Sequence, residues 1–393
     1  MKPLDGIRVV DLSRILAGPY CSMILADLGA EVVKVEEMPN GDEARQVGPF
    51  VEGVSAYFMS LNRGKKSITL NLKDPQGRAL LIELAKRSDI LLENFRPGTM
   101  QKLGLSYDTL AQVNPRLIYG SLSGFGQTGP YASRRAFDII VQGMGGIMSI
   151  TGEPGRPPVR VGAAIGDMGA GLFTAIGILA ALQARERTGV GQQVDVGMLD
   201  CQVALLEYAI IRYTTSGEVP GPLGTRHPWI TPFEVFEAKD GPIVLGVGTK
   251  HWTRFCGKLG LPGLAENPRF ATNALRTTHY EELRPTLAEI MKTKGVEEWI
   301  REMEEIGVPC GPINTVDRVV SNPQVQAREM ITEVEHEGVG KVKMAACPVK
   351  LSETPSGIQG PAPTLGQHTE EVLTQLLGCS TEQVKTLRQD GIV

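Results

Sequence analysis

Residues 7–36 read IRVVDLSRILAGPYCSMILADLGAEVVKVE, and this stretch decides the fold. The runs IRVVDL (7–12) and EVVKVE (31–36) are short and rich in β-branched residues, which is typical of buried strands. Between them, Pro19 to Leu28 predicts a helix with proline in its first turn. A strand, a helix and a second strand in this order indicate a parallel βαβ unit.

The same alternation continues through the first third of the chain. Further strands are expected at SITLNL (67–72), DILLENF (89–95) and LIYGSLSGFG (117–126), and Asp74-Pro75 predicts the start of a helix that runs to Lys86. We therefore expect an α/β fold whose large domain is Rossmann-like and built on a parallel sheet. Parallel sheets bind ligands at the carboxyl ends of their strands. The loops expected there are SRILAGP (13–19), EEMPNGD (36–42), NFRPG (94–98) and SGFGQTGP (123–130).

Changes in composition divide the rest of the chain. The stretch SGEVPGPLG (216–224) is rich in proline and glycine and predicts a linker between domains. Residues 225–325, with a strand at GPIVLGVG (241–248), predict a smaller α+β domain. The large domain would then comprise residues 1–215 and 330–393, and residues 326–366 would form a second linker. Near the end, Ser380 to Gln383 has the pattern of a capping box.

Bulk composition narrows the class of protein. The chain has 393 residues, 42% hydrophobic and 21% charged, and a net charge of −4, which argues against nucleic acid or an anionic membrane as its partner. Its six cysteines are scattered without a CxxC pair, and the N-terminus lacks a secretory apolar region. We expect a cytoplasmic protein that acts on small molecules.

The usual cofactor motifs are missing. The first βα turn reads DLSRILAGP without GxGxxG, and no GxxxxGK[ST], HExxH or GxSxG motif occurs. Nicotinamide, ATP, zinc and a serine nucleophile therefore have no support in the sequence, and we expect no bound cofactor and no metal.

One carboxylate stands out. Asp167 is the only charged residue between Val161 and Ala184, and it lies between Gly166 and Gly169 where an apolar, helix-like run begins. A lone carboxylate in such a place is costly unless it is hydrogen-bonded or functional. It is either an ordinary N-cap or a group that meets another molecule, since glycine neighbours allow close approach.

Taken together, several segments resemble the class III CoA-transferase family, which includes the formyl-CoA, carnitine and bile-acid CoA-transferases. The segments that carry the resemblance are PLDGIRVVDLSRILAGP, LGAEVVKVE, LNRGKKSITLNLKDPQG, ENFRPG, SGFGQTGP, GDMGAGLFTAIGILAAL, GVPCGPIN and LGQHTEEVL. The resemblance implies that Asp167 is a covalent nucleophile that attacks an acyl-CoA thioester and carries coenzyme A to an acceptor acid. Coenzyme A would be a substrate here, and a small carboxylic acid the other partner.

The resemblance also implies a set of site residues. Asp138 corresponds to an acidic position near the nucleophile and is expected to be catalytic with Asp167. The expected CoA-binding residues are Arg14, Ile15, Leu16, Ala17, Leu70, Lys73, Asn94 and Phe95, together with Lys102 and Arg135 at positions that hold the CoA phosphates. The family further implies a homodimer of two interlocked chains.

Two questions stay open at this level. An α-methylacyl-CoA racemase shares these features, but its histidine base would fall at Phe137, which cannot exchange a proton. The segments LNRGKKSI, SGFGQTGP and LGQHT also resemble the dicarboxylate branch exemplified by succinate–hydroxymethylglutarate CoA-transferase. Succinyl-CoA is then a candidate donor. The arginines considered for the second carboxylate of a diacid are Arg45, Arg63, Arg96 and Arg160.

Overall fold

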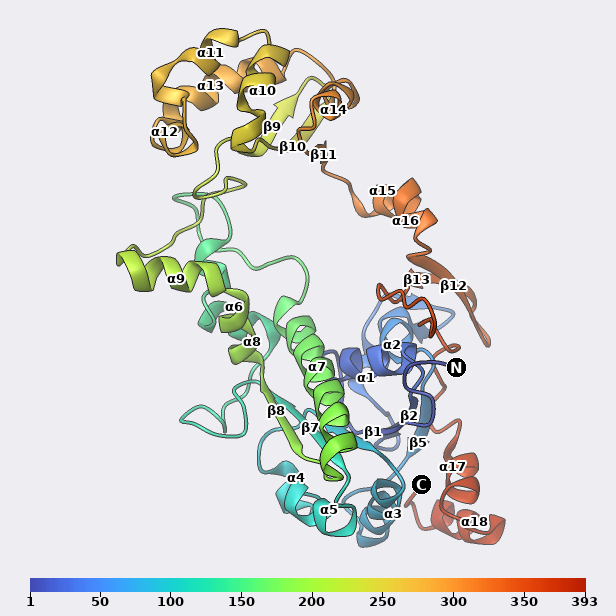
Figure 1. The fold of residues 1–393 in the computed structure, drawn as a ribbon. Helices are drawn as coiled ribbons and strands as arrows, with labels where there is room; N and C mark the ends of the chain where they lie inside the picture. Colours follow the sequence, from blue (N-terminus) through green and yellow to red (C-terminus); the bar gives the residue numbers. More distant parts are fainter. The chain divides into compact units, whose positions relative to one another are not determined.

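The computed structural model describes residues 1–393, and the chain forms two units (Figure 1). Unit 1 comprises residues 1–148, 160–218 and 324–393, and unit 2 comprises residues 149–159 and 219–323. Residues 149–159, which the sequence analysis placed in the large domain, therefore group with unit 2.

Unit 1 is built on a six-stranded parallel sheet. Its strands are β1 (Arg8–Asp11), β2 (Glu31–Glu36), β5 (Lys66–Thr69), β6 (Ile90–Glu93), β7 (Ile118–Ser123) and β8 (Gln193–Gly197). They lie in the order β5-β2-β1-β6-β7-β8. This is the doubly wound order, in which chain direction across the sheet reverses between β1 and β6.

The helices of unit 1 follow the βαβ pattern expected from the sequence. They are α1 (Ala17–Asp27), α2 (Ala56–Asn62), α3 (Pro75–Lys86), α4 (Thr99–Lys102), α5 (Tyr107–Val113), α6 (Asp138–Met144), α7 (Ile165–Thr188), α8 (Met198–Leu205), α9 (Glu207–Ser216), α17 (Thr369–Gln375) and α18 (Thr381–Gln389). Asp74 caps α3 by accepting the Gln76 N–H at 2.8 Å, and the capping box of α18 is present as predicted.

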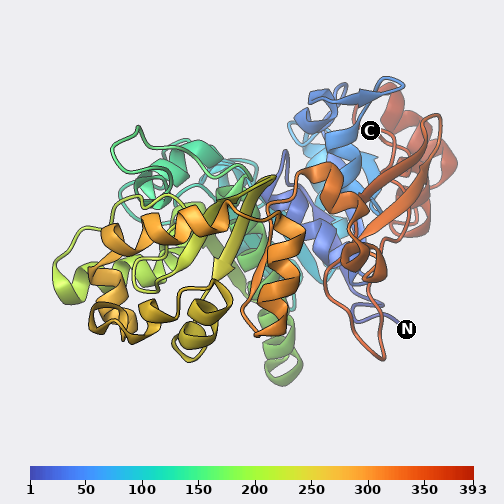
Figure 2. The same ribbon diagram turned by 90° about the horizontal axis from the view of Figure 1, so that it is seen from above.

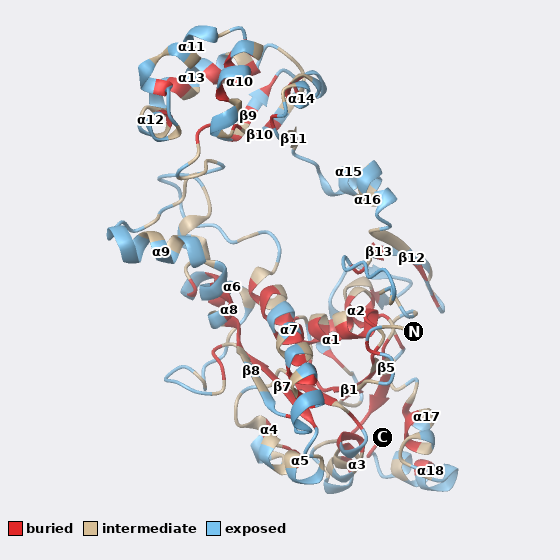
Figure 3. Ribbon diagram, viewed as in Figure 1, coloured by how far each residue is buried: buried red, intermediate tan, exposed pale blue.

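The sheet is covered on both faces, and Figure 3 shows β1, β2, β5, β6 and β7 as mostly buried, whereas β8 at the edge is largely exposed. Successive strand residues point to opposite faces: Val10 joins a core with α3, α5 and the C-terminal helices, whereas Val9 joins a core with α1 and α7. Glycine makes the α1–α7 contact close, because a Cβ at Gly171 would lie 2.7 Å from the Ala17 carbonyl oxygen. The position of α7 is therefore fixed by backbone packing.

Helix α7 is long and apolar enough to cross a membrane by length and composition, but half of its apolar window is buried within the fold. Ala175, Ile178 and Ala181 pack in the core that contains α1. This side of the helix therefore packs in the core of unit 1, while Leu172, Phe173 and Ile176 on its other side are exposed.

Some elements differ from the sequence expectation. The helical segment after β8 is divided at Leu206 into α8 and α9, and β8 was not anticipated. Residues 326–366 are more than a linker, because β12 (Ile331–His336) and β13 (Gly340–Ala345) form an antiparallel hairpin there. This hairpin groups with unit 1, and Figures 1 and 2 both show it beside the N-terminal part of the chain. A two-residue pair, β3 (Phe50–Val51) and β4 (Val54–Ser55), lies near it along a shared cavity.

Unit 2 is a small α+β unit. Its strands β9 (Phe233–Ala238), β10 (Gly241–Gly246) and β11 (Cys310–Pro312) form an antiparallel sheet in the order β11-β10-β9. Its helices are α10 (Trp252–Lys258), α11 (Pro262–Glu266), α12 (Asn273–Thr278), α13 (Tyr280–Met291), α14 (Val296–Glu305) and α15 (Val316–Ser321), and α16 (Pro323–Ala327) begins at the boundary between units. Trp299, Phe255 and Phe236 lie in its separate core.

Candidate functional site

A cavity of about 500 Å³ opens at the carboxyl ends of β1, β6 and β7. It lies where chain direction across the sheet reverses, which is the usual ligand position in a doubly wound fold. The loops after these three strands line it, as the sequence analysis expected. Its lining residues are Arg14, Ile15, Leu16, Ala17, Glu43, Asn94, Phe95, Arg96, Pro97, Leu122, Ser123, Gly124, Arg134, Arg135, Ala136, Phe137, Asp167 and Met198.

Asp167 lies in the first turn of α7 and faces this cavity. Burial raises the pKa of Asp167 to about 7, and the nearby charge of Asp138 adds to the rise. No cationic side chain forms an ion pair with it, and the first turn of a helix offers only a partial positive charge. The group is therefore a poorly solvated carboxyl that is partly ionised near neutral pH.

Asp138 raises the pKa of Asp167 by its charge but is not among the residues that line the cavity. One of its carboxylate oxygens accepts the Gly166 N–H at 2.8 Å, and the other accepts the Gln142 side-chain amide at 2.7 Å. Gln142 in turn accepts the Val161 N–H at 2.9 Å. Asp138 and Gln142 thus hold the segment that leads into α7.

Glycine at position 166 is needed for this arrangement. A Cβ there would lie 2.7 Å from a methyl group of Val141 and 2.9 Å from a carboxylate oxygen of Asp138. Because the Gly166 N–H is bound to Asp138, this amide is not available to a ligand.

The loop after β1 forms one wall of the cavity. The Asn94 side chain holds the backbone of Arg14 twice, accepting its N–H at 2.8 Å and donating to its carbonyl oxygen at 2.8 Å. The Arg14 guanidinium lies 5.0 Å from the centre of the Phe95 ring and pairs with Glu37 and Glu43 at 3.5 Å each. The predicted residues Arg14, Ile15, Leu16, Ala17, Asn94, Phe95, Arg135 and Asp167 thus share one cavity.

The other predicted residues lie around it. Leu70 and Lys73 line a neighbouring cavity of about 270 Å³ that shares Arg14 and Phe95 with the first. Leu70 is buried, whereas the Lys73 side chain is 81% exposed and pairs with Glu37 at 2.6 Å. Lys102 is exposed on α4 and lines neither cavity.

The four arginines considered for the second carboxylate of a diacid differ in whether they line the cavity with Asp167. Arg45 pairs with Glu36 at 2.7 Å and Arg63 with Asp27 at 2.7 Å, both outside the cavity with Asp167. Arg160 donates to the carbonyl oxygens of Val161 and Gly162. Only Arg96 lines the cavity, where it donates to the Ser133 carbonyl oxygen at 2.8 Å and has no carboxylate partner.

Several lining residues were missed by the sequence analysis as site residues. Ser123 ends β7, is 6% exposed, and its hydroxyl oxygen has no hydrogen-bond partner. Phe137 is 76% exposed, and Arg134 stacks on Tyr131 at 3.8 Å. Burial raises the pKa of Tyr57 to about 12, and the charge of Asp167 adds to the rise, so Tyr57 also lies near Asp167. Ser123 could have been found because it lies near the end of a predicted strand, whereas no local pattern in the sequence indicated Tyr57.

Comparison with known proteins places the chain in a family. Residues 4–369 match the family described as CoA-transferase family III. The chain is 44% identical over 352 residues to an acetyl-CoA:oxalate CoA-transferase of Acetobacter aceti, with 89% of each chain covered. It is 41% identical over 382 residues to a succinate–glutarate CoA-transferase of Agrobacterium fabrum, with 95% of this chain and 96% of that one covered.

A solved structure supports the fold. A CAIB/BAIF family protein from Brucella suis superposes with a TM-score of 0.84 at 40% identity, over 95% of this chain and 99% of that one. The parallel-sheet prediction and the family resemblance are both confirmed. The chain belongs to CoA-transferase family III and is a CoA-transferase, an enzyme that exchanges coenzyme A between acyl-CoA thioesters and carboxylic acids.

Proposed function

We propose that Asp167 carries the transfer through covalent intermediates. Its carboxylate oxygen attacks the thioester carbonyl of the donor, the C–S bond breaks, and CoA thiolate leaves as a mixed anhydride forms. The thiolate then attacks the Asp167 carbonyl, giving an aspartyl-CoA thioester and releasing the donor acid. Covalent catalysis of this kind divides one difficult exchange into easier steps.

The second half of the exchange reverses the first. The acceptor carboxylate attacks the aspartyl thioester and expels the thiolate, which gives an anhydride between Asp167 and the acceptor. The thiolate attacks the acceptor carbonyl, so the new acyl-CoA leaves and the Asp167 carboxylate is regenerated. One thioester replaces another, so the exchange needs no ATP, and we propose that it needs no cofactor or metal.

The observation that carries this proposal is the carboxyl of Asp167 in a cavity at the carboxyl ends of the strands, unpaired and with a pKa of about 7. Burial leaves the anion poorly solvated, which makes it a better nucleophile than a carboxylate in water. The unpartnered hydroxyl of Ser123 in the same cavity supports a bound ligand, since a buried hydroxyl without a hydrogen bond is costly.

Coenzyme A would lie along the loops after β1 and β6. Arg14, Ile15, Leu16, Ala17 and Phe95 would contact it in the first cavity, and Leu70 would contact it in the second. Arg135, Lys73 and Lys102 are the cations proposed for its phosphates, since guanidinium and ammonium groups pair well with phosphate oxygens. Asn94 would act through the backbone of Arg14.

For the substrates we propose succinyl-CoA as donor and a small dicarboxylic acid as acceptor. The activity after which the Agrobacterium fabrum relative is named, that of a succinate–glutarate CoA-transferase, supports this class. Arg96 is the arginine proposed for the second carboxylate, because its guanidinium lines the cavity without an acidic partner. A kinetic panel of donors and acids tests this choice, and preference for monocarboxylates over succinate and glutarate would reject it.

The proposed homodimer is supported by an exposed apolar surface of unit 1. Helices α6, α7 and α8 pack against one another, and α9 continues from α8. Their exposed apolar residues are Phe137, Ile139, Ile140, Met144, Leu172, Phe173, Ile176, Val203, Leu205, Tyr208, Ile211 and Tyr213. Exposed apolar residues gathered on neighbouring helices are typical of an interface. A monomer mass in light scattering at micromolar concentration would reject the dimer.

An isotope experiment tests the covalent route. The enzyme is incubated with succinyl-CoA and an acceptor acid whose carboxylate carries ¹⁸O, and the peptide that contains Asp167 is analysed by mass spectrometry. The proposed steps transfer one ¹⁸O from the acceptor into the Asp167 side chain. An unlabelled Asp167 during active exchange would contradict the anhydride. Deuterium at the α-carbon after turnover in D₂O would instead indicate the racemase.

A further inference from the structure

The backbone of the loop after β1 is strained at Ile15. This residue has φ of 66°, in the left-handed region that β-branched side chains rarely adopt. Its side chain lines the cavity with Asp167. A conformation of this kind persists only where the surrounding structure holds it, and it is found most often at functional sites.

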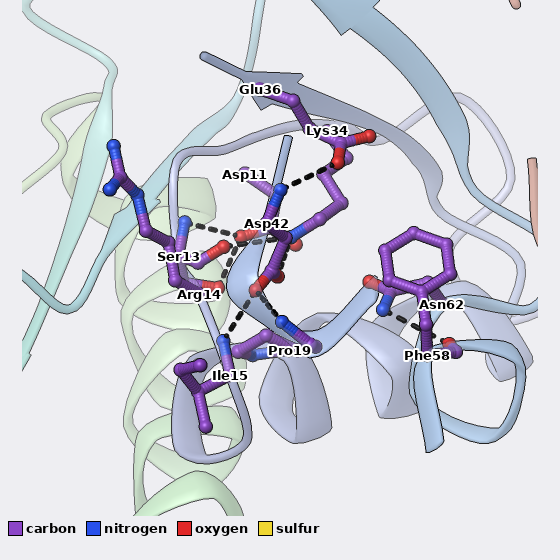
Figure 4. A network of polar contacts seen from close by, with 12 residues as sticks. Asp11, Ser13, Arg14, Ile15, Pro19, Lys34, Glu36, Asp42, Phe58 and Asn62 are labelled. Atoms are coloured by element: carbon purple, nitrogen blue, oxygen red, sulfur yellow. Dashed lines mark hydrogen bonds and ion pairs between the residues drawn. The ribbon is translucent and has the colours of Figure 1, made fainter. Parts of the chain in front are cut away.

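Asp11, at the end of β1, accepts the Ser13 N–H at 2.9 Å. Three side chains from other segments hold the rest of the backbone of residues 13–15, and Figure 4 shows two of these three, Lys34 and Asp42, at the loop. Lys34 donates to the Ser13 carbonyl oxygen at 2.8 Å, and Asp42 accepts the Ile15 N–H at 3.0 Å. Asn94 binds both the N–H and the carbonyl oxygen of Arg14. Four consecutive polar groups of the loop are thus bound by side chains from three other segments.

Asp42 is itself firmly placed. Its carboxylate pairs with Lys34 at 2.8 Å, and both side chains are 1% exposed. It also accepts the Ala44 N–H at 2.9 Å, and its own N–H donates to Glu36 at 3.0 Å. Burial would raise the pKa of Asp42, but Lys34 and the two N–H donors together hold it below its usual value. The contact to Ile15 is therefore made by an ionised, fixed carboxylate.

We propose that Asp42 is a positioning residue for acyl-CoA binding, which holds Ile15 left-handed so that the loop is already in its binding conformation before the ligand arrives. The proposal rests on the proposed CoA site, since Asp42 lines neither cavity and would act only through the loop. Holding Ile15 fixes the direction in which the Arg14 side chain leaves the loop. We call the contact between the Asp42 carboxylate and the Ile15 N–H the clamp. Without it, the backbone at Ile15 relaxes to a right-handed or extended conformation, and part of the free energy of CoA binding must restore the left-handed one.

The test measures binding of CoA to the full-length protein by calorimetry. Asp42→Asn removes the charge that Lys34 pairs with and weakens the contact to Ile15. We expect its Kd for CoA to rise at least about tenfold, which corresponds to a loop that is correctly shaped about one tenth of the time. In steady-state assays the change should appear in KM for acyl-CoA, with kcat little altered.

A matched control separates positioning from loss of stability. Asp27 is another buried aspartate, 1% exposed and paired with Arg63 at 2.7 Å, and it does not contact the loop. Asp27→Asn should lower the melting temperature in the same way and leave the Kd for CoA unchanged. An equal rise of Kd in both variants would overturn the proposal.

A double-mutant cycle tests the strain itself. Asparagine adopts the left-handed conformation more readily than isoleucine, whereas valine is β-branched and resists it equally. In an Ile15→Asn background, Asp42→Asn should therefore raise the Kd less than threefold, and in an Ile15→Val background it should keep its full effect. Equal effects in the two backgrounds would refute the clamp.

Further outcomes are distinguishable. If Asp42→Asn does not fold, Ile15→Asn alone should raise the melting temperature and Ile15→Val should not, because only the former relieves strain; no difference would refute the inference. If the wild-type protein itself does not bind CoA, the proposed function is overturned. If the wild type binds CoA and Asp42→Asn binds it equally well, only the positioning role of Asp42 is overturned.

Discussion

Two kinds of carboxylate lie at the same edge of the sheet of unit 1, and their pKa values are shifted in opposite directions. Asp11 and Asp42, behind the loop after β1, each have a lysine within 3.3 Å, namely Lys65 and Lys34. Asp167, in the first turn of α7, has no cationic partner. Burial acts on all three in the same direction, yet the pKa of Asp11 and Asp42 is held below the usual value and that of Asp167 is raised to about 7.

The difference shows how one fold makes both a framework and a reactive group from the same side chain. A buried carboxylate with a cation and N–H donors is a fixed ion that orders the backbone around it. A buried carboxylate without a cation retains its cost of ionisation and becomes a candidate for chemistry. Pairing, rather than burial, separates the two.

The largest expected effect is the loss of the unpaired carboxylate. Asp167→Ala should lower kcat for CoA exchange at least about 10³-fold, because the step that forms the anhydride has no nucleophile. Steady-state assays with succinyl-CoA and glutarate measure it. Asp200→Ala is the matched control, since Asp200 also lies in the first turn of a helix, and it should stay within about threefold of the wild type. Near-normal exchange by the Asp167 variant would contradict the mechanism.

The second largest effect is expected when the lysine that pairs with Asp42 is removed. Lys34→Met leaves Asp42 buried without its partner and should lower the free energy of unfolding by about 3–5 kcal/mol. Urea unfolding with an unchanged m-value measures this loss. Lys86→Met, which breaks an exposed pair with Glu83, should cost less than about 1 kcal/mol. Similar losses in the two variants would mean that the buried pair contributes no more than a surface pair.

Neutralising the unpaired carboxylate should stabilise the protein. The pKa of Asp167 is higher in the folded chain than in the unfolded one, so the folded state binds more protons between about pH 4 and pH 7. The free energy of unfolding therefore falls as the pH rises through this window. Asp167→Asn should gain on the order of 1–3 kcal/mol at pH 8 and nothing at pH 4. A gain that is the same at both pH values would argue against ionisation as its cause.

The smallest expected effect concerns Asp138, whose charge adds to the raised pKa of Asp167. In the wild type, kcat/KM for acyl-CoA should fall about tenfold per pH unit below an apparent pKa near 7, because protonated Asp167 is not a nucleophile. Asp138→Asn keeps an acceptor for the Gly166 N–H but removes the negative charge. Its acid limb should move to lower pH by less than about one unit. A move to higher pH would mean that Asp138 acts otherwise than by its charge.

Much of the fold was predictable because its signals are local. The β-branched runs and the Asp74-Pro75 cap gave five of the six parallel strands and the helix α3. The strand β8 was missed because its five residues, QVDVG, contain no continuous β-branched run like those of the buried strands, and their alternation is too short to stand out. The hairpin at residues 331–345 was missed because the prolines that follow it suggested a linker.

The site residues likewise include some that local sequence patterns predicted and some that only the folded structure revealed. Asp167 stood out because it is a single charge in an apolar run, and the loop residues followed from the ends of predicted strands. The contact of Asp42 with Ile15 and the pair it forms with Lys34 join segments that only the folded sheet brings together. Tyr57 lies near Asp167 for the same reason. The hydrogen bond from the Gly166 N–H to Asp138 also required the structure, because the family resemblance implies an acidic residue near Asp167 but not which way it faces.

The close crossing of α7 over α1 at Gly171 has a consequence for altering this enzyme. Asp167, the proposed nucleophile, lies on a helix whose distance from α1 is fixed by contact between two backbones. Most of the other residues that line the cavity belong instead to loops after strands, which accept sequence change more readily. Laboratory evolution toward new acids should therefore accumulate substitutions in those loops and leave α7 untouched.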